Sequence, residues 1–259
     1  MTRRICALFA VLTWSISFSA AESLVTAVSH AELAIRSNFT GTEVAVFGTI
    51  ERDIATVARS GEYHVVVLVK GPRERVDARK KGQFFGAWIN RQSIRFARVP
   101  SYYVAASSHP IAEIAAMNAL QQYQIGLDNL TFAAVRPVDD PDSPLPGEVE
   151  FGQSIVRLKA ERGLYSELPG AVRFLSDRLF AVNIPLPANV TTGPYQTEVY
   201  LFREGVLLAS SQNELAIEKS GTNAIIADAA RNQSVLYGLL SLAMAVFTGW
   251  IAGFIFRRD

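Results

Sequence analysis

The last 25 residues of this chain constrain its structure more than any other segment. Residues 235–256 contain no charged side chain, and Arg257, Arg258 and Asp259 then end the sequence. At about 1.5 Å per residue, a helix of these 22 residues is about 33 Å long. That length is enough to cross a hydrocarbon core about 30 Å thick. We therefore expect a C-terminal transmembrane helix at 235–256 and a short tail at 257–259.

The first 21 residues have the pattern of a secretory signal peptide. Two arginines precede a mostly apolar segment at 5–18, and the small residues Ser19, Ala20 and Ala21 follow it. This order predicts cleavage after Ala21, whereas a retained segment would be a short second span. The only cysteine, Cys6, lies inside the segment, so we expect no disulfide in the mature chain.

The basic residues beside the two apolar segments set the expected orientation. Short flanks rich in Lys and Arg stay in the cytoplasm, and here they lie at the two ends of the chain. We therefore expect an inner-membrane protein with its N-terminal domain in the periplasm and its C-terminus in the cytoplasm. A tail of three residues is too short to carry an enzyme, so any signal would pass through the transmembrane segment of another protein.

The central region, residues 22–234, has the size and charge of an ordinary folded domain. Its 213 residues are ample for a hydrophobic core. It contains 21 basic and 23 acidic residues, a net charge of −2. This balance gives no reason to expect nucleic acid as a partner.

Residue patterns predict a mainly β structure for the first part of this region, residues 22–136. Apolar side chains alternate along residues 42–50, and residues 65–69 are continuously apolar, as expected for a strand buried on both faces. Further strands are predicted at 93–96 and 102–106. Short strands separated by Gly, Pro and Asn favour an immunoglobulin-like β-sandwich.

Helical signals follow this β-rich part. Apolar residues at helical spacing predict a helix between Pro110 and Gly126. The four prolines and three aspartates within residues 137–147 predict a linker. A second helix is expected from Glu148 to about Leu164, and its spacing places on one side Phe151, Ile155, Leu158 and the stem of Arg162.

The end of the central region predicts a second β-module. Apolar residues alternate strictly along 180–186 and 195–201. Glu204 and Gly205 form a predicted two-residue turn before two further short strands. Tyr195 follows Gly193-Pro194, where immunoglobulin-like sandwiches often carry a corner tyrosine. We therefore expect a signal peptide at 1–21, a first β-module with a trailing helix at 22–136 and a linker at 137–147. A helix with a second immunoglobulin-like module is expected at 148–234, a transmembrane helix at 235–256 and a tail at 257–259.

Several separated segments carry a resemblance to a known family. They are SNFTGTE at 37–43, VPSYY at 99–103, IGLDNL at 125–130, IPLPANV at 184–190, EVYLFREG at 198–205, and the tail from Gly249-Trp250 to FRRD at 256–259. The chain resembles alphaproteobacterial proteins described as putative transmembrane proteins. The resemblance implies a signal peptide, a periplasmic domain, one C-terminal span and no particular activity. It also implies that the gene lies near genes for permeases of the sulfite-exporter type.

The predicted span carries a stripe of small residues. Ser241, Ala245, Gly249 and Gly253 recur every four residues, so they share one face of a helix. Small side chains let another backbone approach closely, which favours helix association in lipid. We interpret this stripe as a possible contact with the transmembrane helix of a partner protein. The alternative is that small residues are simply common in membrane spans.

A basic cluster is the second candidate site. It consists of Arg73, Arg75, Arg79, Lys80 and Lys81. Three further arginines follow at positions 91, 95 and 98. This charge is suited to an acidic partner surface, an anionic solute or lipid headgroups. The alternative interpretation is a solvated hairpin between two strands.

Motifs for catalysis and metal binding are missing from the sequence. We find no GxSxG, P-loop, GxGxxG, HExxH or CxxC pattern. His109 and Glu113 stand four residues apart, but two ligands do not make a structural metal site. We therefore predict no cofactor, no metal and no enzymatic activity. An envelope hydrolase with a spatially assembled triad is the weakest alternative.

Two functions follow from these expectations. The first is a membrane-anchored interaction domain, an accessory or assembly subunit of a transport or envelope complex, with an integral-membrane partner such as a sulfite-exporter-type permease. The second is a periplasmic binder that presents a small anion or another solute to a permease. A closed, apolar cleft between the two modules with converging arginine side chains would favour the solute binder, and a flat surface would favour the interaction domain.

Overall fold

The computed structural model describes most of the central region and a C-terminal helix. The described residues are 22–35, 39–51, 61–136, 145–219, 230 and 234–255. The predicted signal peptide, most of the predicted linker and the predicted tail lie outside these ranges.

Strands dominate the described region, which confirms the expected mainly β class. A four-stranded sheet has the order β1 (Ser23–Val28), β3 (Gly41–Glu51), β11 (Leu179–Pro187), β10 (Arg173–Phe174). A six-stranded sheet has the order β2 (Glu32–Ile35), β13 (Val206–Lys219), β12 (Gly193–Arg203), β4 (Tyr63–Lys70), β7 (Tyr103–Ser107), β9 (Tyr165–Pro169). The third sheet contains β5 (Arg73–Phe84), β6 (Ala87–Pro100) and β8 (Ala133–Ala134).

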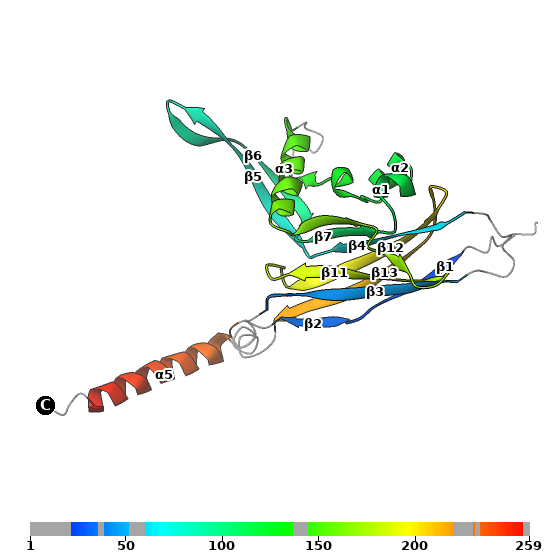
Figure 1. Cartoon of the computed structure of the whole chain (residues 1–259). Coiled ribbons are helices and arrows are strands. Elements are labelled where there is room, and N and C mark those ends of the chain that lie inside the picture. Colours follow the sequence, from blue (N-terminus) through cyan, green and yellow to red (C-terminus); the bar gives the residue numbers. More distant parts are fainter. Residues whose placement is uncertain are drawn as a thin grey trace, which may run out of the picture.

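The first two sheets pack face to face around the main hydrophobic core (Figure 1). Alternate residues of β3 and β11, such as Val46 and Val182, point into this core from the four-stranded sheet. Val65, Val67 and Val69 of β4 enter it from the six-stranded sheet. The sandwich is therefore held together by the burial of aliphatic strand residues.

Helices cover the other face of the six-stranded sheet. They are α1 (Ile111–Ile114), α2 (Met117–Gln122), the short 3-10 helix η1 (Leu127–Asn129) and α3 (Glu148–Glu161). Val66 and Leu68 of β4 pack into this second core together with Ile114 and Leu120 from the helices. Because β4 is covered on both faces, its residues 65–69 are all buried, as the continuous apolar run predicts.

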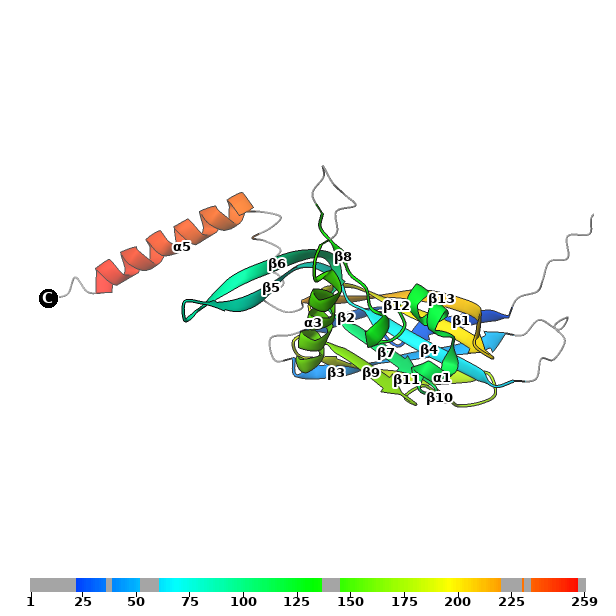
Figure 2. The ribbon, with the colours of Figure 1, turned by 90° about the horizontal axis from the view of Figure 1, so that it is seen from above.

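The third sheet consists mainly of a long hairpin, β5–β6, which projects away from the sandwich (Figure 2). A small third core joins the root of this hairpin to α3. Ile94 and Phe96 of β6 pack there against Phe151 and Ile155 of α3. The hairpin is thus packed against α3 at its root, and its turn projects away from the rest of the domain.

Strand pairing differs from the two separate modules expected from the sequence. Strand β3 pairs with β11 in the four-stranded sheet, and β4 pairs with β12 in the six-stranded sheet. Strands from residues 22–136 and from residues 148–234 therefore share both sheets. Alternation along a strand predicts which face is buried, but it does not predict which strand is the neighbour. The two parts of the sequence build one sandwich.

Three local expectations for helices and strands are also corrected. The helix predicted between Pro110 and Gly126 is two short helices, because Ala115 is extended and forms a bridge with Gly205. In α3, Leu158 is exposed and Lys159 is buried. Strand β13 runs without interruption through the segment expected to hold two strands.

Two turn predictions agree with the structure. Glu204 and Gly205, with φ of 50° and 79°, join β12 to β13 as a hairpin turn with two left-handed residues. The hydroxyl of Tyr195 donates a hydrogen bond of 2.7 Å to the carbonyl of Thr191. That contact is typical of the corner tyrosine in immunoglobulin-like sandwiches. The immunoglobulin-like class itself stays a prediction.

A buried ion pair closes one end of the sandwich. Nη1 of Arg203 lies 3.1 Å from Oε1 of Glu22, and the two side chains are only 4 % and 7 % exposed. The hydroxyl of Tyr63 donates to the same carboxylate oxygen at 2.8 Å, and its ring lies under the Arg203 guanidinium. Glu22, the first residue after the predicted cleavage position, is therefore tied into the folded domain.

Candidate functional site

The projecting β5–β6 hairpin carries the predicted basic cluster. Strand β5 lies at the free edge of its sheet, with β6 as its only neighbour among the described strands. All five members of the predicted cluster belong to β5, at positions 73, 75, 79, 80 and 81. The hairpin geometry agrees with the second interpretation of this cluster, a solvated hairpin between strands.

A groove runs between β5 and α3, with a volume of about 730 Å³. Its wall includes all eight residues 74–81 of β5 and, from α3, residues between Glu150 and Arg162. Because successive residues of a strand point to opposite faces, a groove lined by eight consecutive residues runs along the strand edge. The groove therefore lies beside the free backbone edge of β5.

The groove has an excess of positive charge. Its basic residues are Arg75, Arg79, Lys80, Lys81, Arg157, Lys159 and Arg162, and its acidic residues are Glu74, Asp77 and Glu150. The net charge of the lining is therefore +4 at neutral pH, because Arg, Lys, Asp and Glu are all ionised there. A site with this lining favours an anionic ligand.

Three ion pairs neutralise the acidic residues of the groove. Lys159 contacts Glu74, and Lys80 contacts Glu150 at 2.8 Å. Asp77 pairs with Arg95 on β6, and this hydrogen bond with the guanidinium lowers the pKa of Asp77. Among the described residues, no carboxylate forms an ion pair with the groove arginines 75, 79, 157 and 162 or with Lys81, although the charge of Arg79 also helps to lower the pKa of Asp77. These five cations are available to a ligand.

Lys159 fixes the inner wall of the groove. It is 8 % exposed, and its ammonium group lies against Glu74, the carbonyl of Ser101 at 3.3 Å and the ring of Tyr165. A buried lysine needs such partners because its charge loses water on burial. Lys159 therefore links α3 to β5 and to the sandwich, and so holds the two walls of the groove together.

The contribution of α3 was missed by the sequence analysis. Arg157, Lys159 and Arg162 lie more than 75 residues from the β5 cluster in the sequence, and their spacing is ordinary for an amphipathic helix. Conversely, the predicted neighbours Arg91, Arg95 and Arg98 are not part of the groove wall. They lie on β6, the strand paired with β5, and their side chains are exposed.

A second cavity, of about 550 Å³, contains two of the predicted cations that do not line the groove. Arg73 and Arg98 line it together with Lys70 and Glu214. Arg98 has a φ of 59°, a left-handed conformation that is uncommon for a residue other than glycine. The structure thus divides the predicted cluster, with Arg73 in this cavity and the other four members in the groove.

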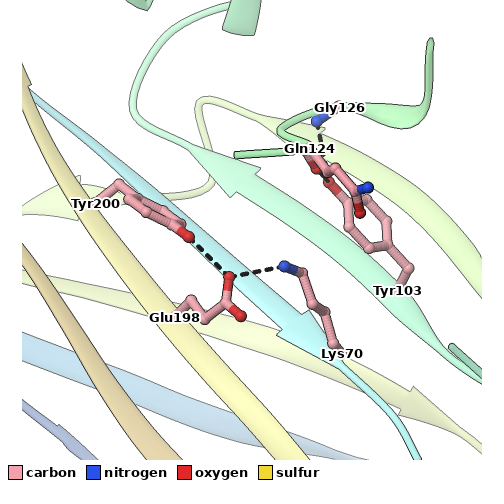
Figure 3. A network of polar contacts seen from close by, with 6 residues as sticks. All are labelled: Lys70, Tyr103, Gln124, Gly126, Glu198 and Tyr200. Carbon is pink, nitrogen blue, oxygen red and sulfur yellow. Dashed lines mark hydrogen bonds and ion pairs between the residues drawn. The ribbon is translucent and has the colours of Figure 1, made fainter. Parts of the chain in front are cut away.

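Figure 3 shows the polar network beside this second cavity. Glu198 accepts hydrogen bonds from Lys70 at 2.7 Å and from the hydroxyl of Tyr200 at 2.8 Å. The hydroxyl of Tyr103 donates to the carbonyl of Gln124 and accepts from the backbone of Gly126. Burial raises the pKa of both tyrosines. The contacts of Tyr103 hold the segment before η1 onto the sheet, and Glu198 links β12 to Lys70 of β4.

Two of the three histidines lie close together. Nδ1 of His64 lies 3.3 Å from Nδ1 of His109. Burial and the neighbouring charge of His109 lower the pKa of His64. In the described part of the chain, no group of three or more His, Cys, Asp or Glu is placed to hold a metal ion.

The small-residue stripe lies on α5 (Ser234–Ile255), which stands away from the sheets in Figures 1 and 2. The stripe residues Ser241, Ala245, Gly249 and Gly253 are exposed. No other described atom lies within 4 Å of the position that a Cβ would take at Gly249 or Gly253. The structure leaves this face open, and its role as a helix contact stays a prediction.

Comparison with protein families gives one match that covers residues 23–258. Its description is "Putative transmembrane protein (Alph_Pro_TM)". The chain belongs to this family. The match confirms the resemblance stated from the sequence, and it associates the chain with transmembrane proteins. No curated protein matches the chain.

A membrane span was also sought in the structure itself. Among the described residues, no helix was found that is both long enough and apolar enough to cross a membrane. The transmembrane helix expected at residues 235–256 therefore stays a prediction from the sequence.

Proposed function

We propose that this chain is a single-pass inner-membrane protein whose periplasmic β-domain binds an acidic segment of an integral-membrane partner. In this function it is an accessory or assembly subunit of a transport or envelope complex, and it acts by binding rather than by catalysis. The observation that carries the proposal is the groove between β5 and α3, with five cations that have no acidic partner among the described residues.

The membrane anchor in this proposal rests on the amino-acid sequence. Residues 235–256 contain no charged side chain and are followed by two arginines. The family description supports membrane association. Large apolar side chains of α5, including Leu239, Met244 and Phe247, are exposed in the structure. Exposed apolar surface of this kind is typical of a segment that contacts lipid or another protein.

The shape of the groove favours an extended polypeptide over a small solute. Its β5 wall, residues 74–81, is about 24 Å long at about 3.4 Å per residue. An extended segment of about seven residues has the same length. The free edge of β5 offers backbone hydrogen bonds to such a segment, and the surrounding cations match acidic side chains. Charged residues also protect free strand edges from aggregation, which is the simplest alternative explanation.

The partner is proposed to lie in the same membrane. Through its small-residue face, α5 would contact a transmembrane helix of that partner, while the groove would hold one of its periplasmic acidic segments. A sulfite-exporter-type permease is the first partner to test, because the family resemblance implies that the genes for the two proteins lie near each other.

Charge reversal in the groove tests this proposal. The full-length variant Arg79→Glu/Arg157→Glu is purified from membranes, and co-purifying proteins are quantified by mass spectrometry. We expect at least a tenfold loss of one integral-membrane partner. The matched control is Arg173→Glu/Arg178→Glu, because Arg173 in β10 and Arg178 just before β11 are both exposed and lie outside the groove. Unchanged co-purification in the groove variant, with folding intact, would contradict a role for the groove.

A solute binder remains the second candidate because of the cavity that contains Lys70, Arg73 and Arg98. Its three cations converge on about 550 Å³, enough for a small anion. Lys70 is already neutralised by Glu198, which weakens this candidate. Titration calorimetry with sulfate distinguishes the two functions. Binding that is lost in Arg73→Ala/Arg98→Ala and kept in Arg75→Ala/Arg79→Ala would favour the solute binder.

A further inference from the structure

The turn of the β5–β6 hairpin does not have the sequence that its backbone favours. Phe85 and Gly86 have φ of 46° and 80°, so both central residues of the turn are left-handed. Asn-Gly or Asp-Gly is the usual solution for this turn, since Asn and Asp tolerate positive φ. A phenylalanine at the first position is strained, and formation of the turn does not require it.

The same phenylalanine is almost completely exposed. Phe85 has 95 % of its surface accessible, and Ile89 on β6 has 43 %. The sequence from 84 to 89, Phe-Phe-Gly-Ala-Trp-Ile, is wholly apolar. We name residues 84–89 the aromatic tip. Exposure of apolar side chains to water is unfavourable. An apolar turn that is both exposed and strained therefore indicates contact with another surface.

Basic residues lie directly behind the aromatic tip. Lys81 of β5 is paired in register with Asn90, and Arg91 follows on β6. Both side chains are exposed, and no acidic partner is found for either among the described residues. An apolar end followed by cations is the order that matches a bilayer surface, where anionic phosphates lie above the acyl chains.

The position of the hairpin agrees with a bilayer as the contacting surface. Figures 1 and 2 show that it projects from the end of the domain where the orange end of β13 lies. Strand β13 is the last strand before α5, so the chain leaves the domain towards its proposed anchor at this same end. The aromatic tip and the anchor are therefore directed to one side of the domain.

We infer that the aromatic tip inserts into the interfacial layer of the bilayer that holds α5, with Lys81 and Arg91 on headgroup phosphates. This inference rests on the proposed membrane anchor and adds a second membrane contact to it. Two separate membrane contacts would fix the orientation of the domain over the membrane. The groove at the hairpin root would then face periplasmic segments close to the bilayer.

Two tryptophans allow the tip and the anchor to be tested separately. The chain contains Trp14, Trp88 and Trp250. In the full-length chain, Trp14→Phe/Trp250→Phe leaves the reporter in the aromatic tip, and Trp14→Phe/Trp88→Phe leaves the one in α5. Each protein is reconstituted into vesicles of phosphatidylcholine and phosphatidylglycerol, with bromine either near the headgroup or deep in the acyl chains.

We expect shallow bromine to lower the emission of Trp88 at least twofold and more than deep bromine does. Trp250 should be quenched in the same vesicles, which reports on the anchor. Unquenched Trp88 with quenched Trp250 would overturn the insertion of the tip and leave the anchor intact. If both tryptophans are unquenched, the proposed anchor fails and the inference fails with it.

Two variants identify the groups responsible. Phe84→Ser/Phe85→Ser should abolish most of the quenching of Trp88, whereas Leu175→Ser, at an exposed leucine outside the hairpin, should not. Lys81→Glu/Arg91→Glu should weaken quenching only when phosphatidylglycerol is present. If Trp88 changes its emission with protein density and not with bromine, the tip contacts a second copy of the chain, which overturns the inference.

Discussion

The end of the sandwich around Arg203 and the groove beside β5 differ in whether their positive side chains have an acidic partner. Arg203 is 4 % exposed and is held by Glu22 and the ring of Tyr63. In the groove, cations such as Arg79 and Arg157 have no acidic partner among the described residues. A buried charge must be compensated inside the protein, whereas a charge at the surface is free for a ligand. The difference distinguishes a structural cation from a binding cation.

The largest expected effect comes from removing the buried cation. Arg203→Met keeps an apolar stem but leaves the Glu22 carboxylate buried without its counter-charge. Breaking a buried ion pair in this way costs about 3–5 kcal/mol. We expect a fall in Tm of roughly 6–20 °C for a domain of this size, measured by thermal unfolding of the purified protein. Arg178→Met, at an exposed arginine, should change Tm by less than about 1–2 °C. An equal fall in Tm for both substitutions would mean that the buried Arg203 stabilises the fold no more than an exposed arginine does.

The same type of substitution in the groove should have a much smaller effect. Lys159→Met retains the buried stem of Lys159 and removes its charge from Glu74. The carboxylate of Glu74 is 41 % exposed, so water replaces the lost partner. We expect a loss of about 1 kcal/mol or less in the free energy of unfolding, measured in urea. A loss as large as that of Arg203→Met would show that the charge of Lys159 stabilises the fold as much as the charge of Arg203 does.

Neutralising the free cations should affect binding without affecting folding. Arg75→Gln/Arg79→Gln removes two like charges that have no acidic partner among the described residues. Substitutions at such surface positions usually change stability by no more than about 0.5 kcal/mol. We expect an unchanged Tm and weaker retention of the full-length chain on an anionic column or by an acidic peptide. Arg173→Gln/Arg178→Gln controls for net charge, and equal weakening by this control would mean that the groove has no special role.

These contrasts also explain what could be predicted from the sequence. The strands around residues 42–50 and 65–69 were predictable because alternation and continuous apolar runs report burial locally. The pairing of β3 with β11 was not, because it depends on contacts between residues far apart in the chain. For the same reason, only one wall of the groove could be predicted from the sequence. Its β5 wall is a continuous basic segment, but its α3 wall is recognised only after α3 packs against the hairpin root.

The smallest expected effect is a pH dependence confined to the sandwich. Burial and the charge of His109 lower the pKa of His64 below its ordinary value of about 6.5, while Glu62 and Glu113 oppose this shift. The unfolded chain therefore binds a proton at His64 before the folded chain does, and stability falls as the pH falls below about 6.5. Thermal unfolding at pH 7.5 and 5.5 should show a smaller acid-induced decrease in Tm for His64→Gln than for the parent. His30→Gln, at an exposed histidine, should behave like the parent. The same decrease in all three proteins would mean that the acid sensitivity comes from carboxylates, and the two regions would then not differ in their response to pH.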